Sequence, residues 1–251
     1  MTEPLRFSIL KHMARSPAHA RYALDNPDAI DSPAMRLGRI AHKLILGATP
    51  GADSFVVFEG ERRGKAWVEF KEANPDADIV SAAEFIKASA MAHSVAAHEE
   101  AQEVLQGEKE RTLLFDYAGR ACRVTPDCFS STLNTEVKTT ADASPGRFPW
   151  QSLREAYPGQ LAWQLYGIKA NKLPVPERVS IVAVENKPPF PVSVFGVTPA
   201  ALEFGWKKCV VWIEEFLNCE RSGIWPGYGP GILDAPPEDF QLIGLDEEAV
   251  A

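Results

Sequence analysis

The sequence predicts one α+β domain, and three observations indicate it. Residues 110–138 and 178–197 alternate apolar and polar side chains, as the strands of a sheet do. Residues 81–105 and 199–222 repeat apolar side chains at helical spacing behind a capping residue. The 251 residues are 45% hydrophobic and contain no linker that separates two cores.

The N-terminal part, residues 1–80, is expected to be helical and to carry basic residues. Ser8 is predicted to cap a short helix, and Ser16-Pro17 and Ser32-Pro33 each start another, because serine caps a helix and proline suits its first turn. The third of these helices is expected to end near Gly47.

Apolar spacing in the third helix places one histidine on its predicted core-facing side. The recurring positions are Met35, Gly38, His42 and Ile45. Two interpretations of His42 follow. It is a hydrogen-bonded core histidine, or it is a metal ligand that reaches the carboxylates described below.

Residues 48–80 are rich in glycine and charge. The basic cluster Glu61–Lys65 suits contact with phosphate, and it is equally ordinary for a surface loop. Ser81 and Glu84 then form a capping box, which opens a long helix to Leu105. His93 and His98 on that helix are expected to be exposed.

Three predicted strands place the residues that are most informative about function. Glu110–Tyr117 and Arg120–Val124 are predicted as a hairpin around Ala118-Gly119, and Leu133–Lys138 follows as the third strand. Asp127 follows the hairpin and is expected to lie at the edge of the sheet, beside the third strand.

The third strand places a carboxylate and an ammonium together. Its alternation puts Glu136 and Lys138 on one face, near Asp127. Carboxylate oxygens are hard ligands that suit Mg²⁺, and a lysine can orient a water or stabilise developing negative charge. Such a site could hydrolyse a phosphodiester, although the same short pattern also occurs on solvated strands.

The remaining elements follow in order. A helix from Tyr157 to Tyr166 carries Gln160 and Gln164 on one face, which form either a polar rim of the site with Trp163 or an ordinary helix surface. Arg178–Glu185 and Pro191–Val197 are predicted as a second hairpin. Thr198-Pro199 begins the last helix, which ends near Gly223, and residues 223–251 form an irregular tail.

Charge and cysteine usage constrain the function. The net charge is −8, yet residues 1–65 carry ten Lys and Arg against seven Asp and Glu, which favours either phosphate contact or an ordinary surface there. Cys122, Cys128, Cys209 and Cys219 lack metal-site spacing and are expected to be reduced, partly buried thiols. No signal peptide or membrane span is predicted, so a cytoplasmic location is expected.

Motifs along nearly the whole chain occur in one order: Leu10–Tyr22, Met35–His42, Gly64–Ala66, Pro126-Asp127, Glu136–Thr139, Tyr157 with Gln160, Val184–Pro189 and Gly223–Tyr228. This series resembles the RecE-like exodeoxyribonucleases of the exodeoxyribonuclease VIII type, a phage and prophage branch of the PD-(D/E)xK nuclease superfamily. The resemblance implies an α/β/α sandwich with a central mixed sheet flanked by helices. It also implies one nuclease domain over residues 1–251, with its core at 81–222.

The resemblance assigns expected roles to individual residues. It implies that Asp127, Glu136, the Val137 carbonyl and His42 hold Mg²⁺, with Mn²⁺ as an alternative ion. Lys138 would position the attacking water, and the expected substrate contacts are Tyr157, Gln160, Arg36 and Arg39. Gln160 is also counted with the catalytic residues. Glu110 falls where relatives often place an acid on the first strand, and Gln164 stands where relatives usually have a tyrosine.

The implied activity is digestion of linear double-stranded DNA from an end, 5′ to 3′, which leaves a single strand. The expected partners are duplex ends, an annealing recombinase and further copies of the chain in a ring, without a membrane. Two alternatives remain: a structure-specific or CRISPR-associated nuclease of the same fold, and a non-catalytic protein that binds DNA or protein.

Overall fold

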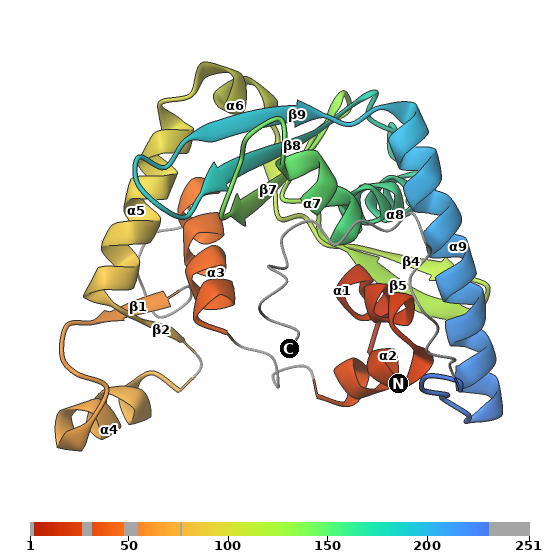
Figure 1. Ribbon diagram of the computed structural model, residues 1–251, viewed down its shortest axis with the longest axis horizontal. Coiled ribbons are helices and arrows are strands. Elements are labelled where there is room, and N and C mark those ends of the chain that lie inside the picture. Colours follow the sequence, from red (N-terminus) through yellow and green to blue (C-terminus); the bar gives the residue numbers. More distant parts are fainter. Residues whose placement is uncertain (1–2, 27–31, 48–54, 76, 231–251) are drawn as a thin grey trace, which may run out of the picture.

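A computed structural model describes residues 3–26, 32–47, 55–75 and 77–230. At its centre lies a five-stranded mixed sheet with the strand order β3-β6-β7-β8-β9 (Figure 1). β7 and β8 are parallel, and each other neighbouring pair is antiparallel. The strands are β3 (Glu108–Lys109), β6 (Cys128–Phe129), β7 (Leu133–Thr140), β8 (Arg178–Glu185) and β9 (Val192–Gly196).

The connection from β7 to β8 covers one face of the sheet. Parallel neighbours need a long crossover, and here it contains two helices, α7 (Phe148–Arg154) and α8 (Tyr157–Ala170). Alternate residues of β8 divide between two cores. Ile181 and Ala183 pack with Phe148 and Leu161 of these helices, whereas Val182 and Val184 pack on the opposite face.

Three helices cover that opposite face (Figure 1): α3 (Pro33–Ile45), α5 (Ala82–Ala96) and α6 (Glu99–Val104). The predicted caps of α3 and α5 are confirmed. The Ser32 hydroxyl accepts from the Met35 N–H, and Ser81 with Glu84 forms the full capping box. The single long helix predicted to Leu105 is wrong, because the chain breaks at Ala97 and His98 caps α6 through Nδ1.

The first predicted hairpin is confirmed, but it forms a two-stranded sheet of its own. β4 (Leu113–Tyr117) pairs with β5 (Arg120–Val124) around Ala118 and Gly119, whose φ angles of 51° and 88° suit a tight hairpin turn. It packs in a third core with α1 (Phe7–Leu10), the 3-10 turn η1 (Lys11–Ala14), α2 (Pro17–Asp25), α8 and α9 (Pro199–Ser222). Ser16 and Thr198 cap α2 and α9, as predicted.

The N-terminal part over residues 1–80, expected to be helical, contains a pair of strands as well as helices. β1 (Phe55–Phe58) and β2 (Asp78–Ser81) form a parallel pair, and α4 (Gly64–Ala73) connects them. Phe55 and Val80 are buried and join the core beneath α3 and α5. Residues 48–54 and 76 lie outside the described part of the chain.

Two local expectations in the N-terminal helices also fail. α1 begins at Phe7 with Arg6 at its N-cap, so Ser8 does not cap it. The buried side of α3 carries Leu37, Ile40 and Ala41, whereas Met35 is 47% exposed. His42 therefore lies beside the core-facing stripe and not within it.

The C-terminal helix ends where expected, since Gly223 adopts φ 72° after Ser222. Residues 223–230 contain no helix or strand, and residues 231–251 lie outside the described part. All four cysteines are buried free thiols. Within the described ranges, no helix is long and apolar enough to cross a membrane.

Candidate active site

A polar row lies on the face of β7 that meets α8. Asn134, Glu136 and Lys138 form this row, because alternate residues of a strand point to the same side. Gln160 and Gln164, one helical turn apart on α8, contact the row. The predicted common face of Glu136 and Lys138 is thus observed, and its surroundings come from the crossover helix.

Glu136 is the most heavily bonded member of the row. It is 4% exposed, and its Oε1 accepts hydrogen bonds from Lys138 Nζ at 2.7 Å and from Gln160 Nε2. Its Oε2 accepts from Gln164 Nε2 at 2.7 Å. Burial, together with the nearby charge of Asp127, raises the pKa of Glu136. Two largely buried carboxylates therefore lie close together.

Asp127 links β7 to α3. Its Oδ2 accepts the backbone N–H of Val137 at 2.7 Å, and its Oδ1 lies 2.9 Å from His42 Nε2. Burial of the His42 ring works against its protonation, but the hydrogen bond and charge of Asp127 outweigh it and raise the pKa of His42. His42 thus reaches the carboxylates and is hydrogen-bonded there, and its role as a metal ligand stays a prediction.

Lys138 is held as an ammonium. Its Nζ donates to Glu136 and to Gln160 Oε1, the latter at 3.0 Å, and it lies 4.8 Å from the centre of the Tyr157 ring. Burial acts to lower the pKa of Lys138, but the charges of Glu136 and Asp127 prevail and raise it. Tyr157 stands at the first position of α8, so the crossover helix supplies both Tyr157 and Gln160 to the site.

Four of these residues, His42, Glu136, Lys138 and Tyr157, line one hollow of about 460 Å³, which we call the site hollow. α3 forms its other wall, where Gly38 lies so close to β7 that a Cβ there would be 3.1 Å from Thr139 Oγ1. The hollow is lined by Gly38, Arg39, His42, Lys43, Glu110, Glu136, Val137, Lys138, Thr139 and Tyr157.

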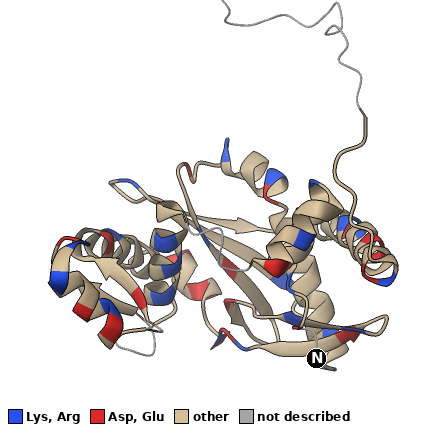
Figure 2. Ribbon diagram, turned by 90° about the horizontal axis from the view of Figure 1, so that it is seen from below, with Lys and Arg blue, Asp and Glu red and all other residues tan. Residues whose placement is uncertain are grey.

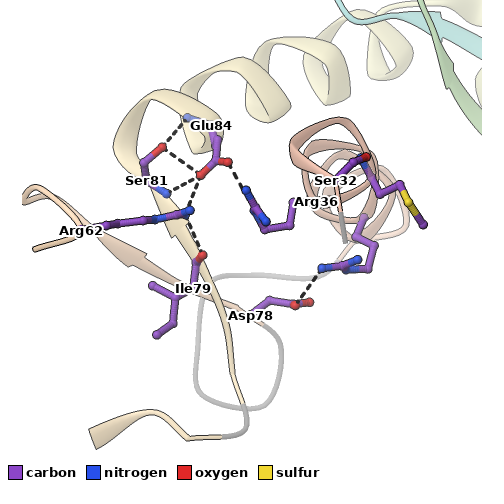
Figure 3. A network of polar contacts seen from close by, with 9 residues as sticks. Ser32, Arg36, Arg62, Asp78, Ile79, Ser81 and Glu84 are labelled. Atoms are coloured by element: carbon purple, nitrogen blue, oxygen red, sulfur yellow. Dashed lines mark hydrogen bonds and ion pairs between the residues drawn. The ribbon is translucent and has the colours of Figure 1, made fainter. Parts of the chain in front are cut away.

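Of the two arginines predicted to contact the substrate, only one lies at the site hollow. Arg39 lines the site hollow and lies 3.4 Å from Asp78, whereas Arg36 lies 3.6 Å from Glu84, away from the carboxylate pair. Figure 3 shows Arg36 and Arg62 meeting at Glu84, with Arg62 also bound to the Ile79 carbonyl. The structure thus brings Arg39 but not Arg36 to the site.

The basic cluster at Glu61–Lys65 is paired locally, in agreement with its interpretation as ordinary surface. Arg62 binds Glu84, Arg63 contacts Glu61, and Lys65 lies 3.5 Å from Glu69. Figure 2 shows Lys and Arg interspersed with Asp and Glu over the helices in that view. The positive balance of residues 1–65 is therefore offset by acids from other segments.

Glu110 lies at the site but not on a strand. It connects β3 to β4 with a φ of 51°, and its Oε1 is 3.8 Å from His42 Nδ1. Its backbone N–H donates to the Asp127 carbonyl at 3.2 Å, which holds this turn beside the carboxylates.

Sequence reasoning missed the buried amide pair behind Glu136. Asn134 Nδ2 donates to Gln164 Oε1 at 3.0 Å, and Gln164 in turn donates to Glu136. Asn134 was identifiable from its alternation with Glu136, whereas Gln164 was noted for its helix face and as a departure from the tyrosine of relatives, without a contact to Glu136. The predicted rim role of Trp163 is wrong, because that side chain is completely buried.

The donor set suits a hard divalent cation. Asp127, Glu136 and the Val137 carbonyl offer oxygen ligands, and the closely spaced, buried carboxylates favour a positive charge between them. Within the described ranges, no group of three or more His, Cys, Asp or Glu side chains is placed so that it could hold a metal ion.

Comparison with known proteins agrees with this architecture. A family model described as "PDDEXK-like domain of unknown function (DUF3799)" matches residues 6–232. The chain belongs to this family. The mixed sheet flanked by helices is thus the fold of the PD-(D/E)xK superfamily, as the sequence resemblance implied.

A solved structure shares the fold at low sequence identity. It is the crystal structure of a protein from Eubacterium rectale named "putative exonuclease", which is similar to this chain with a TM-score of 0.66 and 14% identity. The match covers 94% of this chain and 91% of the other. No curated protein matches the sequence.

Proposed function

We propose that this protein is a divalent-metal-dependent deoxyribonuclease that hydrolyses phosphodiesters of linear double-stranded DNA from an end. The observation that carries the proposal is the convergence of three charged side chains. Glu136 and Lys138 line the site hollow, and Asp127 contacts two of its lining residues, through the Val137 N–H and His42 Nε2. Family membership and the fold shared with the named exonuclease support a nuclease.

Asp127, Glu136 and the Val137 carbonyl would hold the metal ion, with His42 beside them. Mg²⁺ is the expected ion, and Mn²⁺ would fit the same oxygen donors. When bound, such an ion neutralises phosphate charge and lowers the pKa of a coordinated water.

The chain's own residues then position the reacting groups. Lys138 carries a positive charge beside Glu136, where it can orient the water and stabilise negative charge that builds on the phosphate oxygens. Gln160 holds both Lys138 and Glu136, so it fixes the distance between the ammonium and the carboxylate. The water oxygen would bond to phosphorus, the phosphorus–oxygen bond to the departing group would break, and the proton lost by the water would pass through solvent to the departing oxygen.

The finer features rest on the resemblance to RecE-like exonucleases. They are 5′ to 3′ digestion, a ring of several copies around the duplex, and delivery of the resulting single strand to an annealing recombinase. A ring would also help a chain with a net charge of −8 to remain on DNA, because topology replaces part of the electrostatic attraction.

The test is digestion of linear duplex DNA that carries a label at the 5′ or the 3′ end, with Mg²⁺ or with EDTA. We expect wild type to release the 5′ label in short products only with Mg²⁺, and Lys138→Ala to be slower by at least about 100-fold. Lys169→Ala, an exposed lysine on the same helix as Gln160, is the matched control.

The same assay distinguishes the alternatives. Cleavage of closed circular or branched DNA would overturn the exonuclease in favour of a structure-specific enzyme. DNA binding without Mg²⁺-dependent hydrolysis of any form would overturn catalysis and leave a binding protein.

A further inference from the structure

An uncharged hollow lies where α7, the end of β9 and the start of α9 meet. It has a volume of about 220 Å³, and among the described residues no charged side chain lines it. We call it the α7–β9 groove. The two helices also expose large apolar side chains, since Trp150 and Leu153 on α7 are 75% and 41% exposed and Phe204 on α9 is 49% exposed. A surface of this kind suits contact with another polypeptide segment.

β9 forms an unpaired edge of the central sheet (Figure 1). The Val197 N–H, directly after β9, donates to the Val179 carbonyl at 2.7 Å. Because backbone bonds alternate between the two sides of an antiparallel strand, the backbone groups of Val194 and Gly196 point away from β8. Within the described ranges, no strand pairs with that outer side. The sequence of β9, Val-Ser-Val-Phe-Gly, also lacks the proline and charged residues with which edge strands usually resist pairing.

The groove adjoins this free edge. Phe195 of β9 lines the groove, and its ring centre lies 4.8 Å from that of Phe148 on α7. A strand that bonded to the outer side of β9 would place alternate side chains on the same face of the sheet. Such edge pairing gains affinity from backbone hydrogen bonds and specificity from pockets that receive alternate side chains. The groove and the edge together therefore fit an extended peptide with apolar side chains.

The sequence beyond the described part contains a segment of this chemistry. Residues 240–245 read Phe-Gln-Leu-Ile-Gly-Leu and are mainly apolar. Acidic residues flank them on both sides, Glu238-Asp239 before and Asp246–Glu248 after, and residues 231–251 contain no lysine or arginine. We call residues 238–248 the acidic apolar segment.

The charge next to the groove is opposite to that of this segment. Arg147 directly precedes α7 and Arg154 ends it, and their side chains are 82% and 76% exposed. Their nearest acids, Asp142 and Glu155, lie 3.8 Å and 3.7 Å from the guanidinium Nε atoms, so these exposed ion pairs are weak and easily exchanged. Both arginines can therefore turn to the acids that flank an apolar peptide.

The reach of the chain favours the groove of a second copy. The described chain ends beside α2, where the Pro226 carbonyl accepts from the Ala18 N–H at 3.0 Å. α9 begins at the groove and runs for 24 residues before the tail, which corresponds to about 36 Å. The ten or so residues from Pro230 to Phe240 span at most about 36 Å when fully extended. The segment would reach its own groove only with almost no slack, whereas the groove of a neighbouring copy imposes no such limit.

We propose that the acidic apolar segment of one copy binds along the outer edge of β9 of a second copy, with alternate apolar side chains in the α7–β9 groove. Each copy supplies one segment and one groove, so the contact is heterologous and can link more than two copies. This inference goes beyond the proposed activity and is tested without DNA or metal.

The first test measures the mass of the full-length chain by sedimentation velocity over a range of concentrations. Leu242→Asp changes the segment, Leu153→Glu changes the groove, and Ile86→Glu, at a 68% exposed position of α5, is the control. We expect wild type and Ile86→Glu to associate with the same dissociation constant and each of the other two variants to weaken association at least about 10-fold, because each places a charge in an apolar contact. Equal association of all four proteins would overturn the inference.

Mixing the two defective variants tests whether the contact joins different copies. Leu242→Asp retains an intact groove and Leu153→Glu retains an intact segment, so an equimolar mixture should form a 1:1 complex that neither variant forms alone. A mixture that contains only single chains, although wild type associates, would contradict the exchange of segments.

A labelled peptide of residues 236–251 tests the groove directly. Fluorescence anisotropy should show binding to Leu242→Asp, whose groove is not occupied by a neighbour's segment, and binding at least about 10-fold weaker when Leu153→Glu is added. Val194→Pro, which removes an N–H that points away from β8, should weaken peptide binding similarly while the Tm stays close to that of Leu242→Asp. A peptide of the same composition in scrambled order is the control.

Two outcomes would overturn the proposal at different points. The absence of peptide binding would remove the groove as the site. Peptide binding to Leu242→Asp but not to wild type, in a protein that stays a single chain at every concentration, would assign the groove to the segment of its own chain and contradict the second copy.

Discussion

Replacing Gln164 with leucine tests the buried amide pair behind the carboxylate. The substitution nearly conserves volume, but it removes the donor to Glu136 Oε2 at 2.7 Å and the acceptor for Asn134 Nδ2 at 3.0 Å. A hydrogen bond to a charged group contributes about 1.5–3 kcal/mol and a neutral one about 0.5–1.5 kcal/mol. We therefore expect the free energy of unfolding to fall by about 2–4 kcal/mol.

Urea unfolding followed by tryptophan fluorescence measures this loss. For a chain of this size, the expected decrease in Tm is about 4–16 °C. Lys169→Gln, at an exposed position of the same helix, should change neither quantity. The double variant Asn134→Leu/Gln164→Leu should lose less than the sum of the single losses, because it removes both members of one contact.

A loss below about 0.5 kcal/mol in Gln164→Leu would refute the reasoning, since it would mean that neither buried group depends on this amide. Strict additivity of the two single losses would refute the pairing of Asn134 with Gln164 while leaving the bond to Glu136 in place.

Three further outcomes follow from the structure. Gly205→Ala should lower the free energy of unfolding by about 3 kcal/mol, because its Cβ would lie 2.4 Å from the Gly159 nitrogen; Gly146→Ala, with nothing within 4 Å, should not. Burial raises the pKa of Cys122 and Cys209 to about 12, so a thiol-specific disulfide reagent at pH 8 should label them only after urea unfolding. In metal-free protein, the Tm of wild type should exceed that of His42→Gln, because the fold stabilises protonated His42. This difference in Tm should be fully present below pH 6.5 and decline as the pH rises through the elevated pKa of His42. A constant difference in Tm from pH 5.5 to 9 would contradict this.

Local signals predicted much of the fold. The helix starts at Ser16, Ser32, Ser81 and Thr198 were predicted because each cap bonds a backbone N–H three residues away, which the sequence itself specifies. The break at His98 was missed because the apolar pattern continues through it into α6. The pairing of β1 with β2 joins segments about twenty residues apart through α4, and no local pattern encodes it.

In the site, too, the features set by local sequence were predicted and those set by long-range packing were not. The common face of Glu136 and Lys138 follows from the two-residue period of a strand. The side of α3 was misassigned because two adjacent stripes of the helix, one with Leu37 and Ile40 and one with Met35 and His42, both contain apolar residues, and packing against the sheet selects the first. The contacts of Gln164 with Glu136 depend on how the crossover helix lies on β7, which no residue spacing reveals.

The measurement that tests the central claim most directly is the rate of hydrolysis of linear duplex DNA in Mg²⁺ by wild type and by Asp127→Asn, with Asp25→Asn, on the exposed surface of α2, as the control. If Asp127 and Glu136 form the metal-binding carboxylate pair of a nuclease, wild type and Asp25→Asn should cleave at the same rate and Asp127→Asn should be slower by at least about 100-fold. Equal rates in all three proteins would contradict the assignment of the active site, and the absence of cleavage in wild type would contradict the nuclease itself.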